Sequence, residues 1–252
     1  MYEQPLIDKA EIEKRQDAIA DINKHMITRE ELREYLNPIY DLERLITRVT
    51  YMSANPRDLI AFKNSIGMLP PIKTLLEDFD TELLKELQTD MDPLEELYQL
   101  IDASIMEEPP ISVREGGLIK DGYNENVDKY RHAKTEGKTW LAELEAKERE
   151  KTGIKNLKIK FNKVFGYYLE VTNSYRDLVP DYFTRKQTLA NAERYITPEL
   201  KELEDMILGA EDKLINLEYD LFCEVRNRIA AEVVRIQKTA KAVAKLDTFV
   251  SL

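Results

Sequence analysis

The chain has 252 residues, of which 43% are hydrophobic and 34% charged, and it carries a formal net charge of −11 at pH 7. This length suffices for one large domain or two smaller ones, and the acidic balance excludes nucleic-acid binding over the whole surface. The single cysteine, Cys223, permits no internal disulfide, no apolar run reaches the roughly 20 residues of a membrane span, and the N-terminus lacks a signal-peptide pattern. We therefore expect a cytoplasmic protein that does not enter a membrane.

Residues 1 to about 112 are predicted to form a series of short helices. A capping residue followed by proline marks each expected helix start. The side-chain oxygen of the capping residue accepts from a free backbone amide of the first helical turn, and proline suits the first helical position, where no backbone N–H is needed. These pairs are Asn37-Pro38, Asn55-Pro56, Asp92-Pro93 and, later, Thr197-Pro198. The i, i+3, i+4, i+7 spacing of apolar residues after Pro38 and after Pro56 supports half-buried helices. Residues 107–122 contain two prolines and three glycines and are predicted to be a loop.

Two long helical segments are predicted further along the chain. The polar pattern over 123–151 ends at Thr152-Gly153, where glycine suits the left-handed position past a helix end. From Pro198 to about Asp247 a single helix is expected, since apolar residues recur at alternating spacings of three and four. Such a long stripe needs a partner, and we expect the 123–151 helix to pack against it in antiparallel orientation.

Between these helices lies a basic β segment. Residues 151–197 contain nine bases and four acids, a net charge of +5 within an acidic chain. Leu157, Ile159 and Phe161 alternate with polar residues, which predicts a strand with one cationic face. A turn at 163–166, a partner strand at 167–172, a loop at 173–182, a third strand at 183–189 and a fourth at 193–196 complete the predicted sheet.

Common catalytic and metal sites find little support in the residues. His25 and His132 are interpreted as surface histidines, and one cysteine with two distant histidines does not make a zinc site. Gly137-Lys138-Thr139 matches the end of a P-loop, but His132 stands where the first glycine is required. The adjacent carboxylates Glu107 and Glu108 are interpreted as solvated surface, so we expect no enzyme activity, metal or cofactor in this chain.

The basic segment has two interpretations on charge alone. Lysines on an exposed strand prevent edge-to-edge aggregation, and they also attract a polyanion. Asparagine, glutamine and threonine side chains are interleaved with the bases here, and such side chains hold phosphate oxygens without reading sequence. This composition favours contact with a nucleic-acid backbone.

The same segment resembles a known family. Residues 161–172 (FNKVFGYYLEVT) and 185–200 (RKQTLANAERYITPEL) are similar to the clamp of bacterial MutS mismatch-repair proteins. The resemblance extends through 40–45 (YDLERL), 54–59 (ANPRDL), 107–110 (EEPP), 117–124, 148–158 and 246–247, and so covers nearly the whole chain. One departure is Ala190, at a position where many relatives have lysine.

The resemblance implies a mainly α fold (α+β overall). It consists of a helical core with long antiparallel lever helices and a small inserted antiparallel β clamp at their tip. In these terms residues 1–137 and 198–252 form the core and lever domain, and residues 138–197 form the clamp domain, with its β tip at about 154–197. The family's mismatch-reading domain and its ATPase domain, which uses ATP and Mg²⁺, are not recognised in this chain, which we therefore expect to be a fragment.

The resemblance also implies a function. Clamps of this family grip the backbone of double-stranded DNA, and their levers link the clamp to the ATPase domain of a protein expected to be a homodimer. Carried onto this sequence, the expected backbone contacts are Asn162, Lys163, Arg185, Lys186, Thr188 and Asn191. The alternative from another class is a structural coiled-coil scaffold whose basic tip docks a protein or RNA partner.

Overall fold

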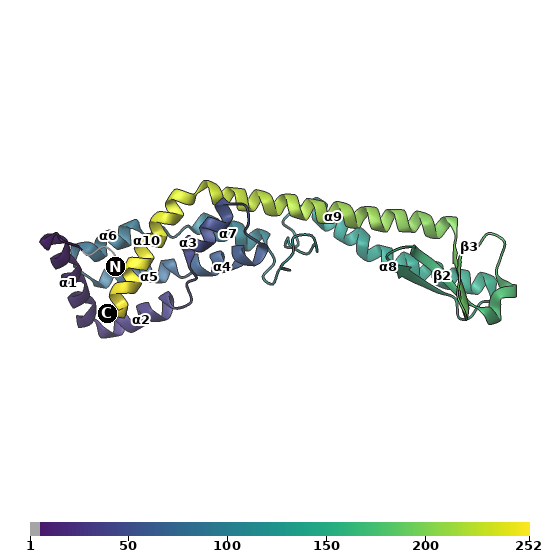
Figure 1. The fold of residues 1–252 in the computed structure, drawn as a ribbon, viewed down its shortest axis with the longest axis horizontal. Helices are drawn as coiled ribbons and strands as arrows, with labels where there is room; N and C mark the ends of the chain where they lie inside the picture. The colour runs from purple at the N-terminus through teal and green to yellow at the C-terminus, as the bar shows by residue number, and fades with distance from the viewer. Residues whose placement is uncertain (1–5) are drawn as a thin grey trace. The chain divides into compact units, whose positions relative to one another are not determined.

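The helices and strands of residues 6–252 are described by a computed structural model (Figure 1). Residues 1–5, on which the expected lack of a signal peptide partly rests, lie outside the described part. The fold is mainly α with a small inserted antiparallel sheet, as predicted. The described part of the chain divides into two compact units, one formed by residues 6–120 and 219–252 and the other by residues 121–218.

The described elements of the first unit are all helices. Its elements are α1 (Lys9–Lys24), α2 (Met26–Leu36), α3 (Leu42–Thr50), α4 (Pro56–Ile66), α5 (Leu69–Leu75), η1 (Leu76–Asp78), α6 (Glu82–Asp90), α7 (Glu95–Ser104), the end of α9 and α10 (Val233–Ser251). Helix α10 lies in its centre, against α1, α2, α3 and α6. The apolar faces of these helices bury phenylalanines such as Phe62, Phe79 and Phe249.

Two of the four proline boundaries begin helices as predicted. Asn55 caps α4 in a reciprocal arrangement, since its side chain accepts from the Asp58 amide at 2.9 Å and the Asp58 carboxylate accepts from the Asn55 amide at 2.8 Å. The hydroxyl of Thr197 accepts from the Leu200 amide at 3.1 Å where α9 begins. Both starts therefore follow the expected local chemistry.

The other two predicted helix starts were wrong. Helix α3 begins at Leu42, after Asp41, whose carboxylate accepts from the Arg44 amide at 3.0 Å, so Pro38 lies in the preceding connection. Asp92 accepts from the Leu94 amide at 2.9 Å, as expected of a cap, but Leu94 takes a left-handed conformation with φ 53°, so α7 begins only at Glu95. The start of α3 is therefore set by a different capping residue, and the start of α7 is set by the backbone conformation of Leu94.

The helix predicted to run from residue 198 to about 247 is also interrupted. Helix α9 spans Pro198–Ala231, and α10 begins at Val233. Between them Glu232 has φ −96° and ψ 16°, and its amide donates to the Ile229 carbonyl, three residues back instead of four. Arg235 beyond the break pairs with Asp92, Glu96 and Glu232. These contacts join distant segments, which the heptad pattern could not reveal.

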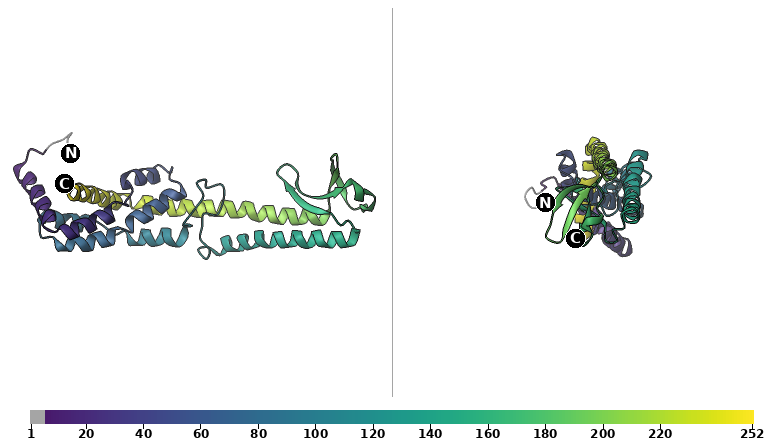
Figure 2. Two further views of the ribbon diagram at one scale, coloured as in Figure 1. Left: turned by 90° about the horizontal axis from the view of Figure 1, so that it is seen from below. Right: turned by 90° about the vertical axis from the view of Figure 1, so that its right-hand side faces the viewer.

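The second unit contains α8 (Glu125–Thr152), a four-stranded sheet and residues 198–218 of α9. Within it α8 and this part of α9 lie side by side (Figure 2). Lys134 pairs with Glu211 at 2.6 Å, and Lys147 pairs with Glu199 at 2.9 Å. The residue numbers of the partners fall along α9 as those of the lysines rise along α8. The two helices therefore run antiparallel, as predicted. Gly153, with φ 71°, ends α8 as expected.

The helix seam contains carboxylates that the heptad pattern did not predict. Glu204 and Glu218 are buried in α9, whereas Leu203 and Leu217, assigned to the seam from the sequence, are half-buried. Glu218 accepts from Arg131 of α8 at 2.6 Å. Glu204 accepts from the backbone amide of Tyr167 in the sheet. Each buried charge is therefore hydrogen-bonded, which is what makes its burial tolerable.

The strands are β1 (Lys158–Asn162), β2 (Gly166–Thr172), β3 (Thr184–Thr188) and β4 (Ala192–Ile196), in the antiparallel order β1-β2-β4-β3. A short 3-10 helix, η2 (Asn173–Leu178), connects β2 towards β3. All four predicted strands are confirmed. A register shift between Arg185 and Gln187 places a bulge at Lys186, which was not predicted.

The two faces of the sheet differ as the alternation indicated. Ile159, Leu169, Val171 and Tyr195 share the inner face and form a core with Leu141 and Leu144 of α8 and with Leu200 and Ile207 of α9. Lys158, Lys160, Glu170 and Arg194 occupy the outer face. The sheet is therefore fixed to its supporting helices through one apolar side.

The compact units group the helices differently from the domains expected from the resemblance. The structural division falls at 120/121 and 218/219, so α8 lies with the sheet. The expected division at 137/138 and 197/198 instead assigns most of the supporting helices to the lever. Within residues 6–252, none of the helices has the length and apolar character needed to span a membrane.

Candidate nucleic-acid interface

The turn between β1 and β2 carries two of the predicted contact residues. The side chain of Asn162 accepts from the Val164 amide at 2.8 Å and so shapes this turn. Lys163 is exposed beside it. Gly166 closes the turn with φ 75°, a left-handed conformation that favours glycine. Because the next amide, of Tyr167, donates to buried Glu204, the turn is attached to α9.

The other predicted contacts lie on β3 and on the turn between β3 and β4. Arg185 is 55% exposed, and Lys186 is exposed at the bulge. Thr188 and Asn191 are exposed at the turn. Asn173 supports this turn, since its amide donates to the Asn191 carbonyl at 3.1 Å and its side chain donates to the Ala190 carbonyl at 3.0 Å.

The two turns lie at opposite ends of the sheet. Gly166 at the first turn pairs with Asn162, whereas Thr172, at the other end of β2, pairs with Ala192 beside the second turn. Six residue steps at about 3.3 Å separate these ends by roughly 20 Å. The structure therefore brings Asn162 and Lys163 together, and Thr188 and Asn191 together, but it does not join the two pairs.

The cations of this unit differ in whether they are already paired. On the outer face Lys160 donates to Glu170 at 2.6 Å, and Arg194 approaches the same carboxylate at 3.7 Å. The hydrogen bond to Glu170 is the main cause that raises the pKa of Lys160. Within residues 6–252, the side chains of four exposed lysines of the segment have no hydrogen bond, ion pair or ring contact: Lys155, Lys158, Lys163 and Lys186. These lysines keep their charge available to an external anion.

Arg194 is a structural residue despite its place in the basic segment. Its guanidinium lies 4.4 Å from the centre of the Tyr168 ring and donates to the side chain of Gln187 at 2.8 Å. Its side chain is 19% exposed. One of its terminal nitrogens and its flat face are used within the sheet, so it links the outer faces of β2, β3 and β4, although its buried Nε has no hydrogen-bond partner among the described residues.

A second cluster was missed from the sequence. Glu193 is buried on β4 and accepts from the hydroxyl of Tyr195. Arg176 of η2 and Arg185 of β3 approach the same carboxylate at 3.6 and 3.5 Å. The hydrogen bond from Tyr195, followed by the two arginines, lowers the pKa of Glu193 against the opposing effect of burial. Burial, together with Glu193, raises the pKa of Tyr195 to about 12, so its hydroxyl remains a donor at neutral pH.

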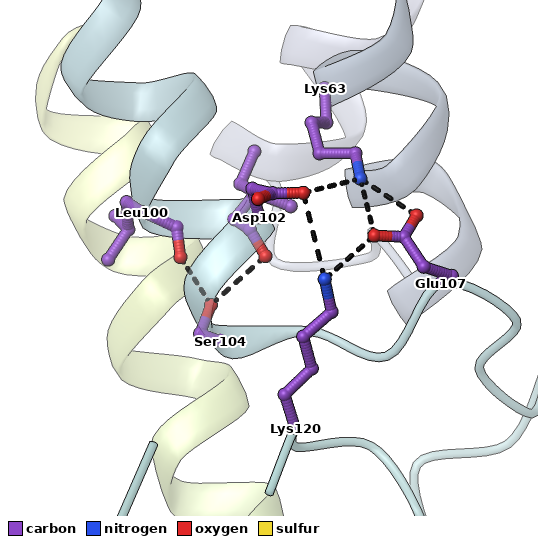
Figure 3. Close-up of polar contacts among 7 residues, drawn as sticks. Lys63, Leu100, Asp102, Ser104, Glu107 and Lys120 are labelled. Carbon is purple, nitrogen blue, oxygen red and sulfur yellow. Dashed lines mark hydrogen bonds and ion pairs between the residues drawn. The ribbon is translucent and has the colours of Figure 1, made fainter. Parts of the chain in front are cut away.

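The carboxylate of Glu107, interpreted from the sequence as solvated surface, belongs to an ion-pair network in the first unit (Figure 3). Lys63 of α4 has a side chain only 4% exposed and donates to Asp102 at 3.0 Å and to Glu107 at 2.8 Å. Lys120 donates to Glu107 at 2.7 Å. Hydrogen bonds from Lys120 and then Lys63 lower the pKa of Glu107 to about 2. The network ties the connection after α7 to two helices.

The two histidines, both interpreted as surface residues, differ in exposure. His132 is 73% exposed and lies 3.2 Å from Glu136, in agreement with a surface position. The side chain of His25 is 41% exposed, and its ring lies 5.2 Å from that of Phe79 in an edge-on contact. No group of three or more potential metal-ligating His, Cys, Asp or Glu side chains occurs within residues 6–252.

Comparisons with known proteins place these features in a family. Residues 2–252 match the model of MutS domain III. The DNA mismatch repair protein MutS of Lachnoclostridium phytofermentans is 66% identical over 250 residues, which are 99% of this chain and 27% of that protein. The MutS proteins of Caldanaerobacter subterraneus subsp. tengcongensis and Acetivibrio thermocellus are 57% and 53% identical, each over 99% of this chain and 29% of their own length. The chain thus spans less than a third of these relatives.

Proposed function

Since the chain belongs to the MutS family of DNA mismatch repair proteins, with its domain III as the matching part, we propose that its sheet binds the backbone of duplex DNA without reading sequence. The predicted contacts Asn162, Lys163, Arg185, Lys186, Thr188 and Asn191 would supply phosphate contacts. The longer protein would act as a homodimer, with ATP and Mg²⁺ bound outside this segment.

The observation that carries the proposal is the unpaired positive charge of the sheet unit. Lys158, Lys163 and Lys186 are exposed and have no ionic partner within residues 6–252, although the chain has a surplus of 11 negative charges. A lysine without a partner carboxylate can neutralise a phosphate and release its counterion. Polar side chains and turn amides beside these lysines supply donors that fix position without distinguishing bases.

The test is a fluorescence-anisotropy titration of the 252-residue chain with labelled duplex at several salt concentrations. We expect the logarithm of the binding constant to fall linearly with the logarithm of salt, by about 0.9 per neutralised phosphate. The double variant Lys163→Glu/Lys186→Glu should bind about tenfold more weakly and show a slope reduced by about 2.

The matched control is Lys241→Glu/Lys245→Glu, which makes the same charge change at exposed lysines of α10 without an ionic partner within residues 6–252. Equal losses in both double variants would indicate a general charge effect and contradict the proposed interface. A preference for structured RNA, or binding that does not respond to salt, would favour the scaffold alternative.

We also propose that α9 transmits movement between the sheet unit and the rest of a full-length MutS protein. The helix is continuous over Pro198–Ala231 and contributes residues to both compact units. Proline inside a helix removes a hydrogen bond and costs about 3 kcal/mol or more. In a full-length protein with this segment, Leu217→Pro should uncouple DNA release from nucleotide state, whereas Leu217→Ala should preserve the coupling. Unchanged coupling in the proline variant would contradict this role.

A further inference from the structure

The buried carboxylate of Glu193 holds two arginines that come from different parts of the sequence. Its side chain is 4% exposed, and the hydroxyl of Tyr195 fixes it from the same strand. Arg176 reaches it from η2, and Arg185 reaches it from β3. Since the carboxylate cannot move into solvent without losing Tyr195, it provides a fixed point for both guanidinium groups.

The protein leaves most of the hydrogen-bonding capacity of these arginines unused. The separations of 3.6 and 3.5 Å from Glu193 are those of ion pairs and exceed the usual hydrogen-bond range. Within residues 6–252, Glu193 is the only carboxylate that either guanidinium approaches, and the side chains are 61% and 55% exposed. Each guanidinium offers five N–H donors, so a local surplus of one positive charge is combined with free donors facing water.

Arg194 provides the internal comparison. It lies on the outer face of the same sheet, but it is mostly buried, stacked on Tyr168 and hydrogen-bonded to Gln187. Its arrangement is that of an arginine used for stability. Arg176 and Arg185 differ from it, because their side chains are exposed, are held by the charge of Glu193 and have most of their donors open to solvent.

We propose that Arg176 and Arg185 jointly bind one phosphodiester group of the nucleic-acid backbone, and that Glu193 is the positioning residue that holds them for it. This inference rests on the proposed binding of the sheet to DNA, and it adds Arg176, which the sequence did not indicate. The two nitrogen atoms lie no farther apart than about 7 Å, the sum of their separations from one carboxylate oxygen, so oxygens of a single phosphate can accept from both at about 2.9 Å.

Neutralising Glu193 separates positioning from simple electrostatics. If only net charge mattered, Glu193→Gln would remove a negative charge near the DNA and strengthen binding. If Glu193 positions the arginines, its loss frees two flexible side chains that must then be ordered on binding, which weakens it. The two accounts therefore predict changes of opposite sign.

The experiment is the same duplex titration with Arg176→Gln, Arg185→Gln, the double variant and Glu193→Gln. Arg228→Gln is the matched control, since Arg228 is exposed on α9 in the other unit and has no ionic partner within residues 6–252. We expect each single arginine variant to weaken binding roughly three- to tenfold. The double variant should lose less than the product of the two losses, because both side chains act on one phosphate.

The outcomes distinguish this inference from the proposed function. Binding of Arg176→Gln equal to that of Arg228→Gln, or tighter binding by Glu193→Gln, would overturn the inference while the effect of Lys163 and Lys186 remained. If the double variant loses affinity by the full product of the two single losses, the two arginines do not bind one shared phosphate. Absence of salt-sensitive binding in the unaltered chain would instead overturn the proposed function. Arg176→Gln changes an exposed side chain, so its result stands even if Glu193→Gln unfolds the sheet.

Discussion

Replacing Gly137 by alanine tests how closely α8 and α9 approach within the sheet unit. A Cβ atom at Gly137 would lie 2.5 Å from Cγ1 and 2.9 Å from Cδ1 of Ile207, which is 5% exposed. Ordinary contact begins near 3.4 Å, so Ile207 or a helix must move by about 1 Å in a close-packed region. Such overpacking costs about 1–3 kcal/mol.

The helix propensity of alanine opposes this effect by about 1 kcal/mol. The expected net result is a loss of stability of about 0–2 kcal/mol. Gly209 of α9 is the matched control, because a Cβ there would meet no atom within 4 Å. Gly209→Ala should therefore stabilise the chain by about 1 kcal/mol.

The measurement is urea unfolding followed by the fluorescence of Trp140, the only tryptophan of the chain, which lies on α8. In an Ile207→Ala background the obstructing atoms are gone, and Gly137→Ala should then become stabilising by about 1 kcal/mol. A reversal of sign between the two backgrounds identifies the contact. If Gly137→Ala stabilises the unaltered chain as much as Gly209→Ala does, the close approach is refuted.

Three further predictions concern the charged network and the first turn. Lys63→Met removes the buried ammonium from Asp102 and Glu107 and should lower the free energy of unfolding. We expect a loss towards the lower end of about 1–3 kcal/mol, because solvent screens the two exposed carboxylates. A change no larger than that of Lys241→Met would contradict the network. The pKa of Glu107 is lowered from about 4.5 to about 2, so its contribution is present above pH 4.5 and is lost as the pH falls towards 2; the difference in urea midpoint between the unaltered chain and Glu107→Gln should shrink over this range, and a constant difference would rule this out. Gly166→Ala forces a side chain into a left-handed conformation next to Glu204 and should destabilise the sheet unit by about 1–3 kcal/mol in the Trp140 assay, whereas an unchanged midpoint would mean that the turn adopts another conformation.

Local chemistry predicted the elements whose causes lie in neighbouring residues. The strands around residues 158–196 follow from alternation, and the ends of α4 and α8 follow from a capping box and from Gly153. The start of α3 was misplaced because Asp41 caps the helix in place of Asn37, and the start of α7 was misplaced because Leu94 takes a left-handed conformation after Asp92 and Pro93. The choice of Asp41 over Asn37 and the left-handed conformation of Leu94 both depend on packing that the sequence alone does not display.

Long-range partners account for the features of the site that sequence could not reveal. Arg176 was overlooked because its partner Glu193 lies 17 positions away, and the bulge at Lys186 depends on pairing with β4. Buried Glu204 and Glu218 were hidden within a helix whose leucines suggested an apolar seam. The sequence predicted which segment carries the positive charge. Only the structure shows which cations of that segment are paired with carboxylates and which are free.

The position of the two turns at opposite ends of β2 has an energetic consequence for any polyanion bound to the sheet. Neighbouring phosphates of one strand follow at about 3.4 Å of helix rise, so groups about 20 Å apart cannot serve the same phosphate or its neighbour. Substitutions at Lys163 and at Asn191 should therefore contribute independently, and their free energies should add within about 0.5 kcal/mol. A ligand too short to reach from one turn to the other would be bound by only one of these two residues and would keep only that contribution to the binding free energy.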